Sequence, residues 1–301
     1  MKHIFIVNPV AGKGKTLGVI PNIKEYFRDK PGETYEIYMT EQKGHATELA
    51  RKVTASGTGR IYSVGGDGTL NEVLNGMIHS DFCLGVFPLG SGNDFIKALC
   101  SNCNPNMSVE QIIQGTEKLI DCAKANDTYF INVASVGFDA EVAENMKLFK
   151  KIPLMGGSLA YIMSIFYTLV RMKPYTIRYE MNNTKETSKY LLIAVCNGKY
   201  YGGGFLPAPN ADLNDGLFDI CQVKYVKRRV VFKCFPKLRD GTHDTLDVVS
   251  MHKTTGIHLQ SEQELCLNLD GEISKAKEIH FELFPKALKI LVPCPLSKNP
   301  G

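Results

Sequence analysis

The stretch Ser63-Val64-Gly65-Gly66-Asp67-Gly68-Thr69-Leu70-Asn71-Glu72 decides how this chain is interpreted. A β-rich run, Arg60 to Val64, leads into three glycines and one carboxylate, and a helical pattern follows. Glycines allow positive φ and let a ligand approach the backbone closely. The start of a helix offers free N–H groups and a positive dipole end to an anion. A carboxylate among such donors fits a phosphate that arrives with a divalent cation better than it fits bare phosphate.

The same stretch carries a helix-start signal. Thr69 and Glu72 have the spacing of a capping box, which predicts that a helix begins at Thr69. The simpler alternative is a tight βα turn without a ligand. Such a turn requires neither three glycines nor a carboxylate, so the segment favours a phosphate site.

The first third of the chain alternates strand and helix patterns. The expected strands are 2–7, 34–39, 60–64 and 83–88, and the expected helices are 15–28, 45–54, 69–78 and 93–99. This alternation predicts a parallel, Rossmann-like sheet with right-handed crossovers. Ligands of such sheets bind outside the carboxyl ends of the strands. We therefore expect the three loops at that edge, 8–14, 65–68 and 89–94, to share one site.

The pattern changes after about residue 122, where short β-rich segments dominate. They are 129–136, 176–181, 190–196, 218–223, 256–259, 265–269 and 279–283, with one helix at 158–171. Strands at this spacing indicate a sandwich or barrel. We therefore predict an α/β domain over 1–122, which 286–301 could complete, and an all-β sandwich domain over 123–285. The last strand, 287–292, could belong to either.

Composition and cysteine usage restrict the class of protein. The chain has 301 residues, 44% hydrophobic and 22% charged, and its net charge of +4 is too weak by itself to indicate nucleic-acid binding. The longest apolar stretch, 159–170, is shorter than the roughly 20 residues that span a bilayer. A strand pattern from Lys2 leaves no room for a signal peptide. Nine scattered cysteines and seven histidines without metal-ligand spacing predict reduced core thiols in a cytoplasmic protein, with neither a disulfide frame nor a zinc site.

One segment is strongly basic. It runs from Lys224 to Arg239 and contains seven basic residues and no acidic ones, with Val230, Val231, Phe232 and Phe235 interleaved. A solvated helix face is one interpretation. The other interpretation is that this segment binds peripherally to the inner face of an anionic membrane. Each basic residue near such a surface contributes roughly 1 kcal/mol to the binding free energy.

The other two loops could also bind phosphate. Gly14-Lys15-Thr16 fits the end of a P-loop, but Pro9 stands where the first glycine belongs, so a strict Walker A site is not expected. In the third loop, Gly90-Ser91-Gly92-Asn93-Asp94, either Asn93 or Asp94 could bind a ligand or merely cap the following helix.

Gly65-Gly66-Asp67-Gly68-Thr69 resembles the nucleotide motif of NAD kinases, phosphofructokinases and the diacylglycerol kinase catalytic domain. Further motifs resemble those of the diacylglycerol and sphingosine kinase group, and of its soluble bacterial lipid kinases in particular. They are Asn8-Pro9-x-x-Gly12, Gly90 to Asp94, Gly137-Phe138-Asp139, Gly202-Gly203-Gly204 with Pro207-x-Pro209, Asp212 to Leu217, and Leu269-Asp270-Gly271-Glu272. The resemblance extends from Ile4 to about Val292.

The resemblance implies a role for each matching residue. Asp67 and Asp94 would lie near the catalytic Mg²⁺, and Glu272 would be the general base. Asp212, Asp215 and the carbonyl of Leu217 would hold a structural Mg²⁺, although a plain β-turn at 214–216 is an equal alternative. The ATP site would consist of Asn8, Pro9, Val10, Ala11, Gly12, Thr40, Gly65, Gly66, Asp67, Gly68, Thr69, Leu70, Asn71, Glu72 and Ser91.

These roles predict an ATP- and Mg²⁺-dependent lipid kinase that phosphorylates a hydroxyl of diacylglycerol or a related lipid, giving a phospholipid such as phosphatidic acid. The acceptor lipid and the oligomeric state, a homodimer included, are left open by the sequence. An NAD kinase is one alternative, although the second domain contains no Pro-Thr-Gly-Ser-Thr-like segment. A catalytically silent nucleotide-binding regulator is another, which the presence of Asp67, Asp94 and Glu272 disfavours.

Overall fold

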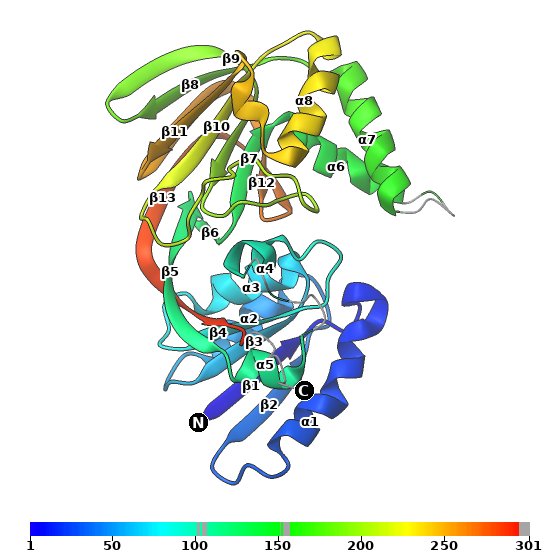
Figure 1. The fold of residues 1–301 in the computed structure, drawn as a ribbon, viewed down its shortest axis with the longest axis vertical. Coiled ribbons are helices and arrows are strands. Elements are labelled where there is room, and N and C mark those ends of the chain that lie inside the picture. Colours follow the sequence, from blue (N-terminus) through cyan, green and yellow to red (C-terminus); the bar gives the residue numbers. More distant parts are fainter. Residues whose placement is uncertain (101–102, 104–106, 151, 153–156, 295–301) are drawn as a thin grey trace, which may run out of the picture. The chain divides into compact units, whose positions relative to one another are not determined.

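A computed structural model describes residues 1–100, 103, 107–150, 152 and 157–294. The chain divides into two compact units (Figure 1). The first contains residues 1–122, 213–215 and 284–301, and the second contains residues 123–212 and 216–283.

The first unit is built on a parallel sheet. Its strands are β1 (Lys2–Val7), β2 (Thr34–Met39), β3 (Arg60–Gly65) and β4 (Cys83–Pro88), in the spatial order β4-β3-β1-β2. The end of β13 (Glu272–Val292) joins this sheet next to β4, with Ile290 paired in parallel to Leu84. The predicted parallel sheet is therefore confirmed, and the last strand segment completes it.

Helices cover this sheet and fix its loops. They are η1 (Ala11–Val19), α1 (Ile20–Phe27), α2 (His45–Val53), α3 (Asp67–Met77), α4 (Asp94–Leu99) and α5 (Val109–Ile113). On one face, Phe27 of α1 and Ile112 of α5 pack in one cluster with Phe5 and Tyr62 of the sheet. Helix α3 approaches α2 so closely that a Cβ at Gly76 would lie 2.5 Å from the carbonyl oxygen of Thr47.

The second unit is an antiparallel sheet system. Its strands are β6 (Thr128–Phe130), β7 (Val133–Gly137), β8 (Tyr175–Met181), β9 (Thr184–Cys196), β10 (Phe218–Lys224), β11 (Val249–Thr254), β12 (Gly256–Leu269) and the first part of β13. The order along the sheet is β11-β10-β9-β7-β12-β13, and β8 pairs with both β9 and β12. Strand β5 (Thr116–Ala125) pairs with β13 and β6 and continues from the first unit.

Both faces of the central strands are buried. Along β9, Ile193 and Val195 point into a core formed by strands alone, whereas Ala194 and Cys196 point into a second core. That second core lies under the helices α6 (Phe138–Lys150), α7 (Gly157–Arg171) and α8 (Arg228–Asp240), which lie together on one side of the sheet, with η2 (His243–Thr245) after α8 (Figure 1). The period of two along a strand explains the alternation.

Several local predictions were wrong. The segment before α1 is a 3₁₀ helix, η1, and the expected strand 129–136 is two strands, β6 and β7. The expected separate strands 256–259 and 265–269 form one strand, β12, whose pairing register shifts between Gln260 and Leu265. Strands β5 and β11 and helices α5 and α6 were not anticipated.

The cysteine prediction was partly wrong. Cys100 and Cys103 form a disulfide across the spacing Cys-x-x-Cys. The other seven cysteines carry free thiols, and five of them are buried, as expected for core residues.

Candidate functional site

The three glycine-rich loops of the first unit come together at the carboxyl ends of β1, β3 and β4. The backbone N–H of Asn8 donates to the carbonyl of Val64 (3.0 Å), and that of Leu89 donates to the carbonyl of Gly65 (2.9 Å). A Cβ at Gly66 would lie 3.1 Å from Cα of Gly90, so the second and third loops touch backbone to backbone. The predicted gathering of these loops is confirmed.

The first loop takes an unusual backbone conformation. Gly12, Lys13 and Gly14 are successive left-handed residues, with φ of 58°, 60° and 86°. A Cβ at Gly12 would overlap the carbonyl oxygen of Leu89. Thr16 anchors the loop by donating its hydroxyl to the carbonyl of Asn8 (2.7 Å). Successive backbone amides in such turns form concave sites for anions.

Asp67 connects the second and third loops. Its Oδ2 accepts from the N–H of Asn93 (2.8 Å), and its Oδ1 accepts from the N–H of Asp94 (3.1 Å). The carboxylate therefore caps α4, a role that the sequence left open for Asn93 or Asp94. Asn93 instead closes its own loop: its amide donates to the carbonyl of Pro88 and accepts from the N–H of Gly90.

Asp67 and Asp94 bring two carboxyl groups together in a largely buried environment. Burial raises the pKa of Asp67, and the negative charge of Asp94 raises it further, against the lowering effect of the backbone N–H bonds. Asp94 is 6% exposed, and Lys97 Nζ lies 2.8 Å from its Oδ1. A cation between two such carboxylates would relieve their repulsion.

The site has the donors that Mg²⁺ prefers. A Cβ at Gly92 would lie 2.9 Å from Oδ2 of Asp67 and 3.6 Å from Oδ2 of Asp94, so both carboxylates face the space that this glycine leaves open. Carboxylate oxygens and water are the usual ligands of Mg²⁺. The residues present therefore fit a hydrated Mg²⁺.

The predicted capping box is wrong. Helix α3 begins at Asp67, and its N-cap is Gly66. The carboxylate of Glu72 instead accepts from the N–H groups of Gly44 (2.9 Å) and Ala46 (3.2 Å), so it caps α2. Thr69 accepts through its hydroxyl from the amide of Asn8 (3.1 Å), which ties the first loop to the second.

The remaining predicted nucleotide residues differ in place and exposure. Val10 (79% exposed) and Ser91 are exposed, and Thr40 follows β2 with its N–H on the carbonyl of Val7 (2.9 Å). Pro9, Ala11, Gly12, Gly65 and Gly66 belong to the joined loops, and Gly68 lies in the first turn of α3. Leu70 and Asn71 are buried, at 3% and 5% exposure. Like Glu72, they belong to α3 and not to the loops.

In the second unit, Glu272 follows a tight hairpin turn between β12 and β13. Asp270 and Gly271 both have positive φ (49° and 98°), as a two-residue hairpin requires. The Asp270 carboxylate accepts from the N–H groups of Ile131 (2.7 Å), Asn132 (3.1 Å) and Val133 (2.9 Å). The turn is therefore a fixed platform for Glu272, which is partly buried.

The proposed structural metal residues lie just before β10. Asp212 and Asp215 are exposed, and Leu217 is partly buried. Leu213, between them, accepts through its carbonyl from the N–H of Asp121 (2.7 Å). A metal role for this turn stays a prediction.

An apolar pocket in the second unit was not predicted from the sequence, because residues from three α-helices and four strands (β9, β10, β11 and β12) build it. The cavity measures about 770 Å³ with its open mouth, and its apolar lining includes Val142 of α6, Tyr161 of α7, Phe235 of α8 and Leu192 of β9. Asp139 and Asn268 add polar groups to the lining. Mostly apolar pockets with a few polar groups typically hold small ligands.

Asp139 is the unusual member of this lining. Burial raises the pKa of its carboxyl group, although nearby Ser135 and Tyr201 lower it in part. Neither carboxyl oxygen makes a hydrogen bond of standard geometry with a described residue. A buried polar group in that state suits a ligand with a hydroxyl or amine.

Comparison with known families agrees with this architecture. Residues 2–125 match the family described as "Diacylglycerol kinase catalytic domain", and residues 132–292 match the "YegS C-terminal NAD kinase beta sandwich-like domain". The chain therefore belongs to the diacylglycerol kinase family, in its branch with a YegS-type second domain. This confirms the resemblance and the predicted fold class, an α/β domain followed by a sandwich-like domain.

Individual relatives cover nearly the whole chain. A "Probable lipid kinase YegS-like" protein of Shewanella frigidimarina is 30% identical over 88% of this chain and 87% of its own length. A "Diacylglycerol kinase" of Mycobacterium tuberculosis is 27% identical, over 97% and 95%. The crystal structure of a putative diacylglycerol kinase from Bacillus anthracis shares the fold, with a TM-score of 0.74 at 24% identity over 98% and 97%. Membership in a kinase family implies ATP as the phosphoryl donor.

Proposed function

We propose that this protein transfers the γ-phosphoryl group of ATP, with Mg²⁺, to the free hydroxyl of diacylglycerol or a related lipid, giving phosphatidic acid or its counterpart. The observation that carries this proposal is the connection between the pocket and the predicted base. Asn268 lines the pocket, and its side-chain oxygen accepts from the N–H of Gly271 (2.8 Å), next to Glu272. An apolar chain bound there would have its polar end near a carboxylate.

The pocket suits the acceptor. Its walls are aliphatic and aromatic, which favours an acyl chain through burial of apolar surface. Asp139, without a standard hydrogen bond to the described residues, would accept one from a hydroxyl of the lipid. NAD, a large polar acceptor, fits such walls poorly.

The first unit would hold the donor. The N–H groups of the three loops would bind the phosphates, and exposed Lys13 and Lys15 would add positive charge. Asp67 and Asp94 would hold Mg²⁺, partly through water, and the ion would neutralise charge on the transferring group. Asp212, Asp215 and the Leu217 carbonyl would hold a second, structural ion.

Glu272 would complete the reaction as general base. Its carboxylate would take the proton of the lipid hydroxyl while that oxygen forms a bond to the γ-phosphorus and the bond from phosphorus to the ADP oxygen breaks. A base of this kind contributes about 10²- to 10⁴-fold to the rate.

The lipid would come from a membrane that touches α7 and α8. Among the described residues, no helix is long and apolar enough to cross a bilayer. Helix α7 nevertheless exposes an apolar stripe: Leu159 (52%), Ile162 (48%), Met163 (40%), Phe166 (50%) and Val170 (67%). A contiguous exposed apolar stripe is a common mark of an interaction site.

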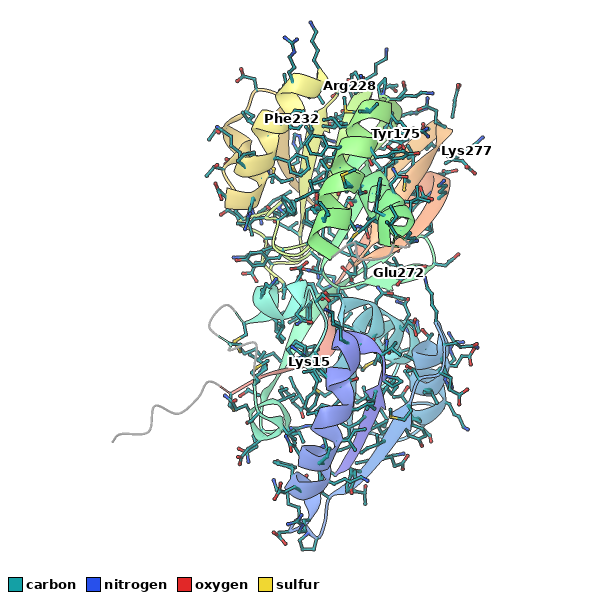
Figure 2. All side chains as sticks on the ribbon, turned by 90° about the vertical axis from the view of Figure 1, so that its right-hand side faces the viewer. Lys15, Tyr175, Arg228, Phe232, Glu272 and Lys277 are labelled. Carbon is teal, nitrogen blue, oxygen red and sulfur yellow. A yellow bond between two sulfur atoms is a disulfide. The ribbon has the colours of Figure 1, made fainter. Side chains whose placement is uncertain are left out.

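Helix α8 extends the stripe and surrounds it with charge. Phe232, 49% exposed, contacts Phe166 with ring centroids 5.9 Å apart. Arg228 donates to the carbonyl of Val170 (2.6 Å), and Lys227 and Arg229 beside it are exposed. Figure 2 shows Arg228 and Phe232 on α8. An apolar face with a basic rim fits the interface of an anionic lipid surface.

Another face of α8 lines the pocket through Val231, Cys234, Phe235 and Leu238. The helix would therefore contact the membrane on one side and the bound lipid on the other.

The transfer reaction tests the function. The protein is incubated with labelled ATP, Mg²⁺ and dioleoylglycerol in vesicles of phosphatidylserine and phosphatidylcholine, and the products are identified by mass. We expect phosphatidic acid. Transfer to NAD but to no lipid would replace the proposal with an NAD kinase, and MgATP binding without transfer to any acceptor would replace it with a silent regulator.

A pocket variant tests where the acceptor binds. Ala143→Trp should fill the cavity and reduce transfer to long-chain more than to dioctanoyl acceptors, whereas the matched Ala143→Ser should leave both unchanged. An equal effect on both chain lengths would contradict acyl binding in this pocket.

Vesicle sedimentation tests the membrane surface. Reversing the charges of Lys227, Arg228 and Arg229 together should weaken binding to anionic vesicles at low salt, and added salt should weaken binding of the unaltered protein, because screening acts over about 10 Å at 0.1 M. The double variant Phe166→Ser, Phe232→Ser should weaken binding at every salt concentration.

The control keeps the same change in net charge. Reversal of three exposed basic residues on α1 and α2 (Lys24, Arg51 and Lys52) should leave vesicle binding unchanged. Equal loss in both triple variants would show that only overall charge matters, and unchanged binding in both would make the basic stretch a solvated face.

A further inference from the structure

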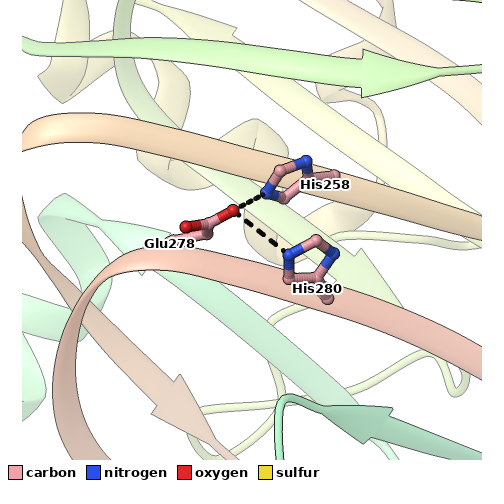
Figure 3. A group of neighbouring side chains, drawn as sticks. All are labelled: His258, Glu278 and His280. Carbon is pink, nitrogen blue, oxygen red and sulfur yellow. Dashed lines mark hydrogen bonds and ion pairs between the residues drawn. The ribbon is translucent and has the colours of Figure 1, made fainter.

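Three side chains on the β12–β13 hairpin form a cluster that the proposed kinase reaction does not use. Residue His258 of β12 pairs directly with His280 of β13, and Gln260 pairs with Glu278 in the same register. Because alternate residues of a strand share a face, these four side chains lie on one side of the hairpin. Figure 3 shows His258, Glu278 and His280 directed toward one another.

The functional atoms of the cluster converge on one point. Nε2 of His258 lies 2.9 Å from Oε1 of Glu278, and Nε2 of His280 lies 3.3 Å from the same oxygen. The two imidazole rings stack, with centroids 3.7 Å apart and an angle of 14° between planes. The potential ligand atoms, one from each residue, all lie within 4.8 Å of one another.

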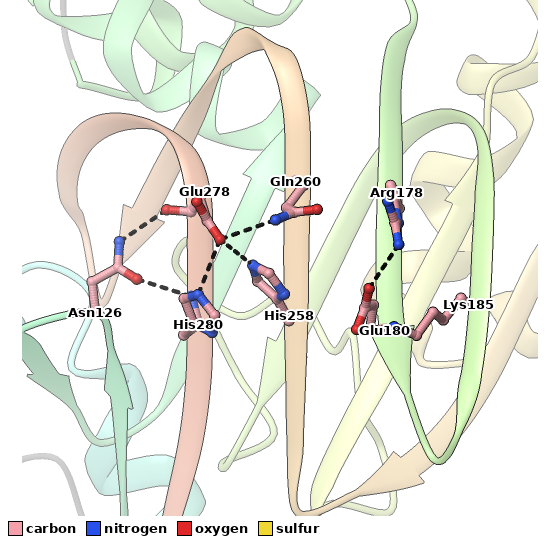
Figure 4. Close-up of polar contacts among 8 residues, drawn as sticks. All are labelled: Asn126, Arg178, Glu180, Lys185, His258, Gln260, Glu278 and His280. Carbon is pink, nitrogen blue, oxygen red and sulfur yellow. Dashed lines mark hydrogen bonds and ion pairs between the residues drawn. The ribbon is translucent and has the colours of Figure 1, made fainter.

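Neighbouring residues hold the cluster in this arrangement. The amide of Gln260 donates to Oε1 of Glu278 (3.0 Å). Asn126, which follows β5, binds the backbone of two cluster residues: its amide N–H donates to the carbonyl of Glu278, and its side-chain oxygen accepts from the N–H of His280. Figure 4 shows both sets of contacts.

A row of charge continues from the cluster across the next strand. Glu180 of β8 pairs directly with His258, and Arg178 of β8 pairs with Gln260. Glu180 is itself held by Arg178 (3.0 Å) and Lys185 (2.9 Å), as Figure 4 shows. The surroundings are thus polar and ordered, which is typical of the outer shell of a metal site.

We propose that His258, Glu278 and His280 bind a divalent transition metal ion of the Zn²⁺ class. Two imidazoles and one carboxylate are the ligand set of many zinc sites, with bonds of about 2.0–2.2 Å. In tetrahedral geometry such bonds put ligand atoms roughly 3.3 Å apart, close to the separations found here. A small rotation of Glu278 would admit the ion, and the fourth position would be open to water.

The position of the cluster indicates a surface site that exchanges its metal. The side chains of His258, Glu278 and His280 are 19%, 53% and 62% exposed. They join β12 to β13 in the hairpin whose turn carries Glu272, and none of the three lines the apolar pocket. The ion would cross-link the hairpin and so stabilise the folded state by its binding free energy.

The sequence gives no signal for this site. The two histidines lie on different strands, and only the register of the hairpin brings them together. The site is also independent of the proposed kinase activity, since it shares no residue with the Mg²⁺ site or with the base.

Metal titration of the full chain tests the proposal. After treatment with chelator, the protein is titrated with Zn²⁺ and with Cu²⁺, and binding is followed by calorimetry and by electron paramagnetic resonance. We expect one ion per chain at this site, a Cu²⁺ spectrum with nitrogen ligation, and an increase in melting temperature with Zn²⁺.

Variants identify the ligands. His258→Gln and His280→Gln should each weaken Zn²⁺ binding by at least tenfold and Glu278→Gln by about tenfold, the order expected when a site loses a ligand or its support. His252→Gln removes an imidazole from strand β11, which pairs with β10 and not with this hairpin, and should have no effect. Circular dichroism of each variant would confirm that it folds.

Two results would overturn the proposal. One is the absence of Zn²⁺ and Cu²⁺ binding at micromolar concentration. The other is binding that the double variant His258→Gln, His280→Gln leaves unchanged, which would assign the metal to the free thiols.

Discussion

The carboxylate of Asp67 accepts a hydrogen bond of 3.1 Å from the backbone N–H of Asp94. One acidic residue of the site therefore caps α4, the helix that begins at the other acidic residue. Asp67 also accepts from Asn93 (2.8 Å). The acid pair is therefore positioned by the fold before any cation binds. Burial and the negative charge of Asp94 both raise the pKa of Asp67, because they destabilise its ionised form. A cation between the two carboxylates would stabilise that form.

Asp67→Asn tests this arrangement. The amide keeps one acceptor for the N–H groups of α4 but loses the charge, so we expect MgATP affinity or kcat to fall by about 10- to 100-fold while folding persists. Titration of Mg²⁺ at fixed ATP measures the effect. A variant with unchanged Mg²⁺ dependence would show that Asp67 is only a helix cap.

Gly12 and Gly14 form a matched pair for the first loop. Both have positive φ, but a Cβ at Gly12 would overlap the Leu89 carbonyl, whereas a Cβ at Gly14 has no atom within 4 Å. Gly14→Ala should cost about 1 kcal/mol of unfolding free energy from the backbone alone, and Gly12→Ala should cost roughly 1–3 kcal/mol more and weaken ATP binding. Denaturant unfolding measures the difference, and equal costs would contradict the close approach of the loops.

The sequence predicts the frame of this site better than its details. Strands 2–7 and 83–88 agree with the structure to the residue, because strands buried on both faces form continuous apolar runs. Strand 34–39 also agrees, although it is the largely exposed edge strand of the sheet. The role of Glu72 could not be predicted in this way. Its partners Gly44 and Ala46 belong to another helix, and only the packing of α2 on α3 brings them within reach.

The second unit was harder to predict for the same reason. Polar residues between Gln260 and Leu265, where the pairing register shifts, divide one long strand into two apparent ones. The pocket depends on α6 and α8 packing over β9. No local period contains that information.

Asp270→Ala tests the platform that holds Glu272. The substitution leaves three backbone N–H groups, those of Ile131, Asn132 and Val133, without their charged acceptor. We expect a loss of about 3–5 kcal/mol in unfolding free energy, with Asp270→Asn in between. Urea unfolding measures both. A loss below about 1 kcal/mol for Asp270→Ala would show that these hydrogen bonds do not fix the turn.

The lowered pKa of the buried His3 should make the stability of the fold depend on pH. Burial lowers its pKa to about 4, against the raising effect of Glu33, whereas the unfolded chain has the ordinary value near 6.5. Between these values the unfolded state binds more protons, so stability falls as the pH falls from about 6.5 to 4 and is unaffected above about 7. The full loss is about 3 kcal/mol, since each pKa unit corresponds to 1.36 kcal/mol.

His3→Gln supplies the comparison, because an amide can still bond the hydroxyl of Tyr62, which lies 2.9 Å from Nδ1 of His3, but does not titrate in this range. Unfolding free energies of both proteins at pH 4.5, 5.5, 6.5 and 7.5 give the two slopes. A variant with the same slope as the unaltered protein would assign the acid sensitivity to other groups.

The proposed lipid kinase function is tested most directly by phosphoryl transfer to diacylglycerol by Glu272→Gln, with MgATP binding measured on the same preparation. Glutamine keeps the size of the side chain and removes its basicity, so we predict unchanged MgATP affinity and a kcat lower by about 10²- to 10⁴-fold. Transfer at the unaltered rate would contradict the assignment of Glu272 as the base that activates the lipid hydroxyl.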